Sequence, residues 1–189
     1  MVAEPSGHTV PASGARAAAR VLIVWWSMTD GTRQLAEAAA GGAREVAGDC
    51  VPGEGRPVEI DVVEAPRAGP EHVLAADALV FATPENLASM AGMMKDFFDR
   101  TYYAVLGRVE GRPYASIVCA GSDGQGAVRQ IERIATGWRL RRVADPLVVI
   151  TNAQTPQAIL ATKRIAGPDL ARAHELGAAI AAGVSLGVW

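Results

Sequence analysis

Three segments of this chain combine hydroxyl side chains, small residues and glycines, and each directly follows an apolar run. The first segment consists of Ser27, Met28, Thr29, Asp30, Gly31 and Thr32. Hydroxyl groups can donate to phosphate oxygens, and a glycine allows the tight turn that aims backbone amides at an anion. The start of the following helix adds about half a positive charge. The segment therefore suits a terminal phosphate, although the same residue types also serve as a simple helix cap.

Two common phosphate-binding motifs are absent from this first segment. A P-loop requires Gly-x-x-x-x-Gly-Lys followed by Ser or Thr, and the segment contains no lysine. A dinucleotide site requires Gly-x-Gly-x-x-Gly after the first strand, which is also missing. The sequence therefore favours a single phosphate over a pyrophosphate.

The other two segments have the composition of loops that approach a flat ligand. The second runs over residues 83–92 and begins with Thr83, Pro84, Glu85, Asn86, Leu87 and Ala88. Proline fixes its own φ and keeps the preceding residue extended, while the polar side chains can bond to a ring edge. The third is a turn before a helix and consists of Gly121, Ser122, Asp123, Gly124, Gln125 and Gly126. Such turns are common, so the third segment gains meaning only if it lies beside the other two.

The elements around these segments alternate between strand and helix. Apolar runs rich in β-forming residues predict strands over residues 21–26, 58–63, 78–82, 114–120 and 147–150. Helical periodicity predicts helices over residues 33–47, 71–76, 93–106, 127–138 and 169–182. We therefore expect an α/β protein with a five-stranded parallel sheet, order 2-1-3-4-5, and helices on both faces. In this order strands one, three and four are neighbours, so the three segments meet at one edge.

Composition and charge limit the remaining possibilities. The chain has 189 residues, a length that favours a single domain. Its net charge of −2 argues against a nucleic-acid partner. No apolar stretch approaches the ~20 residues of a membrane span, and residues 1–14 do not resemble a secretory signal. Cys50 and Cys119 do not form a disulfide framework. We expect a flexible tail over residues 1–19, a single domain over residues 20–189, no membrane insertion, no metal site and a cytoplasmic location.

Two of the segments carry a family resemblance. The pattern Ser27-x-Thr29-x-Gly31-Thr32 resembles the phosphate loop of flavodoxins and flavodoxin-like reductases. The run from Thr83 to Tyr103 looks like the Thr-Pro…Gly…Met-Lys-x-Phe-x-Asp-Arg signature of two related groups. These groups are flavodoxin-type NAD(P)H:quinone reductases and NADPH-dependent FMN reductases. The resemblance covers residues 21–150.

The resemblance implies a flavodoxin-like fold with bound FMN and with NADPH or NADH as electron donor. FMN would contact the first segment, the second segment from Thr83 to Leu87, and Gly121, Ser122, Asp123 and Gly124. Hydride would pass from NAD(P)H through FMN to a quinone, flavin or similar small-molecule electron acceptor. Flavin carries this chemistry itself, so no catalytic side chain is required. Family members commonly form homodimers or homotetramers.

Two alternatives remain open at this stage. A flavodoxin-type electron carrier is usually strongly acidic, whereas this chain has 18 basic and 20 acidic residues. A binding domain of the same fold with weak or lost FMN binding is the other alternative. It depends on Asp30, Leu87 and Ala88, which depart from the family pattern. The Asp30 carboxylate faces either the phosphate or the solvent.

Overall fold

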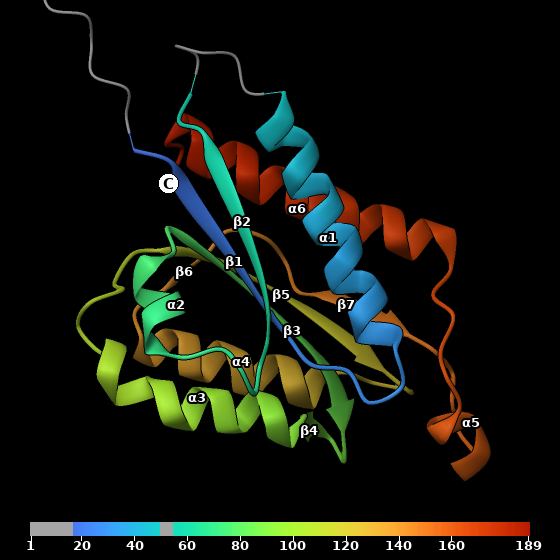
Figure 1. The fold of residues 1–189 in the computed structure, drawn as a ribbon. Helices are drawn as coiled ribbons and strands as arrows, with labels where there is room; N and C mark the ends of the chain where they lie inside the picture. Colours follow the sequence, from blue (N-terminus) through green and yellow to red (C-terminus); the bar gives the residue numbers. More distant parts are fainter. Residues whose placement is uncertain (1–16, 50–54) are drawn as a thin grey trace, which may run out of the picture.

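The computed structural model describes residues 17–49 and 55–189 (Figure 1). Its strands are β1 (Ala19–Trp25), β2 (Val58–Glu64), β3 (Ala78–Asn86), β4 (Ser89–Met90), β5 (Pro113–Ala120), β6 (Arg141–Arg142) and β7 (Leu147–Ile150). Its helices are α1 (Gly31–Gly48), α2 (Pro70–Ala75), α3 (Gly92–Val105), α4 (Gln125–Gly137), α5 (Pro156–Leu160) and α6 (Gly167–Leu186). Most of the predicted tail and Cys50 lie outside the described residues. Ala19, the last residue of that predicted tail, is buried and begins β1.

The sheet confirms the predicted fold class and has more strands than predicted. Its order is β2-β1-β3-β5, and both β6 and β7 pair with β5 in parallel. The predicted fifth strand is β7, with the predicted bounds, and β6 is an additional short strand along the same edge of β5. Pro146 lies between β6 and β7 and has no amide proton to donate to the ladder, so the two do not join into one strand.

The prediction that the second segment is a loop is wrong, because the segment forms a hairpin. Strand β3 continues through Asn86, and the chain then returns as the antiparallel strand β4. Leu87 and Ala88 form the two-residue connection, with φ values of 51° and 58°. Two-residue hairpin turns with positive φ at both positions match the natural twist of the strands but favour Asn-Gly. The sequence lacks that signal, which is why the hairpin was not predicted.

Helices cover both faces of the sheet (Figure 1). Alternate residues of β1 enter two separate apolar clusters, with Val21 packing toward α1 and α6, and Leu22 toward α2, α3 and α4. Helices α1 and α6 approach closely, because a Cβ atom on Gly177 would lie 1.8 Å from the carbonyl oxygen of Ala39. One face of the alanine-rich α6 therefore packs closely on α1. No helix in the described part of the chain is both long and apolar enough to cross a membrane.

Candidate functional site

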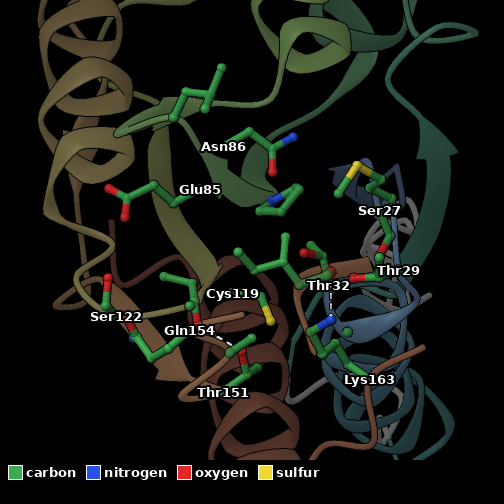
Figure 2. A pocket seen from close by; sticks show the side chains of 18 of the residues that line it. Ser27, Thr29, Thr32, Glu85, Asn86, Cys119, Ser122, Thr151, Gln154 and Lys163 are labelled. Carbon is green, nitrogen blue, oxygen red and sulfur yellow. Dashed lines mark hydrogen bonds between the residues drawn. The ribbon is translucent and has the colours of Figure 1, made fainter. Parts of the chain in front are cut away.

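A cavity of about 530 Å³ lies at the carboxyl ends of β1, β3, β5 and β7 (Figure 2). Most of the residues predicted to bind a ligand line it: Ser27, Met28, Thr29, Gly31, Thr32, Pro84, Glu85, Asn86, Leu87, Gly121 and Ser122. The strand order explains this meeting, since β3 pairs with both β1 and β5. The structure thus places residues of all three segments around one cavity.

Four residues of the predicted set do not line the cavity: Asp30, Thr83, Asp123 and Gly124. Thr83 is fully buried, and its hydroxyl accepts a hydrogen bond from the Ala91 amide at 3.1 Å. This bond closes the base of the β3–β4 hairpin. Gly124 precedes α4 with a φ of 80°, where glycine is favoured. Asp123 is exposed on the turn.

Asp30 occupies the left-handed conformation that favours glycine, with a φ of 73°. Its carboxylate pairs with the Arg33 guanidinium and also accepts a hydrogen bond from Gln34 Nε2 at 3.1 Å. The hydrogen bond from Arg33 holds the pKa of the Asp30 carboxyl below its usual value. Asp30 is therefore ionised and paired along α1, and its carboxylate is not part of the cavity wall.

Thr32 gives the cavity a binding group that lacks a partner. Its side chain is 1 % exposed, and Oγ1 has no hydrogen-bond partner among the described residues. Burying a hydroxyl without a partner is costly, and one that also lines a cavity can be satisfied by a ligand bound there. Thr32 lies in the first turn of α1, where backbone amides and the helix dipole favour an anion. The hydroxyls of Ser27 and Thr29 line the same end of the cavity. This end fits the phosphate group of a mononucleotide.

Glu85 holds the second and third segments together. One carboxylate oxygen accepts from the Gly124 amide at 2.7 Å, and the other accepts from the Gly126 amide at 2.9 Å. A Cβ atom on Gly126 would lie 2.0 Å from the carbonyl oxygen of Ala88, so the hairpin tip packs directly on α4. The predicted bond from Glu85 to a ring edge is thus replaced by a contact that fixes the shape of the cavity.

Sequence reasoning missed seven residues of the cavity wall: Cys119, Ala120, Thr151, Ala153, Gln154, Ile159 and Lys163. Ala88, which also lines the cavity, belongs to the predicted second segment. Residues 151–154 follow β7, whose carboxyl end lies beside that of β5. The rule that ligands bind at the carboxyl ends of parallel strands could have indicated them. Lys163 lies further along the chain, and no local pattern marks it. Burial raises the pKa of the Cys119 thiol to about 11, so this wall is neutral at Cys119.

Comparison with known proteins identifies the family. Residues 31–155 match the model of the NADPH-dependent FMN reductases. The chain belongs to this family. Membership confirms the predicted resemblance, together with FMN as the cofactor.

Individual relatives share about a third or less of their residues with this chain over the matched regions. An NAD(P)H dehydrogenase (quinone) of Acidithiobacillus ferrooxidans is 34 % identical, over 43 % of this chain and 46 % of that protein. A flavodoxin of Aquifex aeolicus is 31 % identical, over 57 % of this chain and 51 % of that protein. The chain thus spans about half the length of these relatives. A solved flavodoxin from the domain Archaea has a TM-score of 0.69 and 19 % identity, covering 87 % of this chain and 98 % of that one. This last likeness confirms the flavodoxin-like fold.

Proposed function

We propose that the protein is an FMN-dependent reductase that oxidises NAD(P)H and reduces a quinone, a flavin or a similar small acceptor. The observation that carries this proposal is the cavity at the strand ends. One end has the unpartnered Thr32 hydroxyl at the start of α1, and the other is lined by residues of the β3–β4 hairpin and of the turn before α4. This combination suits a phosphate joined to a flat ring.

The residues of the chain bind and orient, while the cofactor supplies the redox chemistry. Bound FMN would supply hydride chemistry: two electrons and one proton from NAD(P)H would reach the acceptor, and a second proton from solvent would complete the reduction of a quinone to a hydroquinone. Pro84, Asn86 and Gly121 line the end of the cavity that would hold the ring. Met28 and Ile159 also line the cavity and are 51 % and 44 % exposed, so they offer apolar surface to a flat acceptor.

A flavodoxin-type carrier is the second candidate, favoured by the likeness to flavodoxins. The two functions differ in whether NAD(P)H reduces the bound FMN directly. We also propose a cytoplasmic location, which the free thiol of Cys119 supports, and a homodimer or homotetramer. Light scattering during size-exclusion chromatography measures the oligomer directly.

The test of the proposal is anaerobic mixing of FMN-loaded protein with NADPH or NADH, followed by absorbance near the flavin maximum. If the protein is a reductase, its bound FMN should lose its yellow colour within the turnover time and regain it when a quinone is added. Colour that persists with both nucleotides rules out the reductase and favours the carrier.

Substitution of two threonines tests the placement of the phosphate. Thr32→Val keeps the side-chain shape and removes the unpartnered hydroxyl, so it should weaken FMN binding without lowering stability. Thr101→Val is the matched control, since Thr101 Oγ1 is also buried and unpartnered but belongs to α3 and not to the cavity. Equal FMN affinity of the two variants would show that Thr32 does not contact the phosphate.

A further inference from the structure

Lys163 is attached to the phosphate end of the cavity through its backbone. Its amide donates to the carbonyl oxygen of Thr29 at 2.8 Å, and its own carbonyl oxygen accepts from Gln34 Nε2 at 2.8 Å. A Cβ atom on Gly31 would lie 3.3 Å from the Lys163 Cβ atom. The lysine side chain therefore starts beside the first turn of α1, and it lines the same cavity as Thr29 and Thr32 (Figure 2).

The charge of Lys163 is not balanced by a carboxylate. Its Nζ donates to the carbonyl oxygens of Ala158, Ile159 and Ala161 at 2.8, 2.8 and 2.6 Å. No acidic side chain of residues 17–49 and 55–189 forms an ion pair with it. The chain has one other lysine, Lys95, which pairs with Asp99 at 2.6 Å. Lys163 thus carries a positive charge that neutral groups alone hold at the cavity wall.

The position of this charge matters to an anion at the start of α1. It is close enough to oppose part of the rise in the pKa of the neighbouring Cys119 thiol. The hydroxyls of Ser27, Thr29 and Thr32 at this end are neutral, and the nearby Arg33 is already paired with Asp30 and Glu37. Asp169 acts on the same thiol with the opposite sign, and its carboxylate is paired with Arg172 at 3.1 Å. An ammonium that donates to a phosphate gains the attraction between opposite charges in addition to the hydrogen bond, which a neutral carbonyl does not offer. A phosphate in the cavity therefore competes well for the protons of Nζ.

We propose that Lys163 is a phosphate-binding residue of the cofactor site, and that it gives the site its preference for a phosphorylated flavin over the unphosphorylated ring. In the structure its ammonium rests on the carbonyl groups at the end of α5, and it turns at least one proton to the phosphate when FMN binds. This inference rests on the proposed function, since it assigns a residue to the FMN of that same site.

The test compares the dissociation constants of FMN and riboflavin, measured by quenching of flavin fluorescence, because riboflavin lacks only the phosphate. Lys163→Met should weaken FMN binding about tenfold or more and leave riboflavin binding within about twofold of wild type. Lys95→Met is the matched control, because it removes the other lysine, whose side chain is exposed on α3 and does not line the cavity. It should change neither constant. Riboflavin binding also reports whether each variant keeps a formed cavity.

Three results would overturn the inference. If Lys163→Met weakens FMN and riboflavin equally, Lys163 acts only by holding α5 in place. If it changes neither constant, the ammonium does not contact the phosphate. In both cases wild type still binds FMN, so the proposed function survives. If wild type binds neither flavin, both the proposed function and the role of Lys163 are refuted.

Discussion

Replacing Glu85 by alanine tests how the cavity is held in shape. The carboxylate of Glu85 accepts hydrogen bonds from the amides of Gly124 and Gly126, at 2.7 and 2.9 Å, and a longer one from Ala127 at 3.4 Å. These amides belong to the start of α4, which has no intrahelical partners for them. Glu85→Ala therefore leaves two partly buried donors without their acceptor and removes a favourable charge from the helix N-terminus.

The expected loss of stability follows from these bonds. A hydrogen bond to a charged group contributes about 1.5–3 kcal/mol, and the longest of the three contributes little. Because Glu85 is partly exposed and water can replace it, we take the lower value for each of the two short bonds. The free energy of unfolding should fall by about 3 kcal/mol, and Tm by about 6–12 °C in a protein of this size.

Thermal and urea denaturation of wild type and variant measure this loss. Glu110→Ala is the matched control, because Glu110 forms an exposed ion pair with Arg139 at 2.9 Å. Exposed pairs contribute about 0–1 kcal/mol, so this control should change Tm by no more than about 4 °C. Equal effects of the two substitutions would refute the role assigned to Glu85. Glu85→Gln, which keeps one acceptor oxygen, should fall between wild type and alanine.

Four further predictions concern Asp30, the β3–β4 hairpin turn and Cys119. Asn tolerates the left-handed backbone of Asp30, so Asp30→Asn should leave FMN affinity within about twofold of wild type, whereas clearly tighter binding would place the carboxylate against the phosphate. Arg33 lowers the pKa of the Asp30 carboxyl in the folded state. The ionised carboxylate therefore adds stability above its pKa in the unfolded chain, about 3.9, and this contribution disappears as the pH falls through its lower pKa in the folded protein. Denaturation of Asp30→Asn should therefore differ from wild type at neutral pH and converge with it in acid. The double substitution Leu87→Asn with Ala88→Gly should raise the free energy of unfolding by about 1 kcal/mol. Asn and Gly are the residues that a hairpin turn with two positive φ values favours. An unchanged Tm would contradict this prediction. Burial raises the Cys119 pKa from 9.0 to about 11. In a Cys50→Ser variant at about pH 8, iodoacetamide should therefore modify Cys119 at least about 100-fold more slowly than a free thiol of ordinary pKa. A rate within about tenfold of the free thiol would contradict this prediction.

Much of the site could be predicted from the sequence, because it depends on strand order. The segments after β1, β3 and β5 were recognisable by composition, and parallel pairing forces their carboxyl ends together. The proposed phosphate end could be predicted from local features that a sequence shows directly, namely the hydroxyls of Ser27 and Thr29 and the turn at Gly31.

The missed parts depend on contacts between distant residues. Leu87 and Ala88 have no intrinsic preference for positive φ, and the turn is formed because Glu85 and Gly126 fix the hairpin against α4. Lys163 reaches the cavity because its backbone bonds to Thr29, more than a hundred residues earlier in the chain. No local pattern encodes either contact.

The most direct test of the account is a titration of the purified protein with FMN, followed by flavin fluorescence. The account predicts quenching that saturates at one FMN per chain, with Thr32→Val binding more weakly than Thr101→Val. Unquenched fluorescence at FMN concentrations far above those of the protein would contradict the assignment of the cavity as a cofactor site.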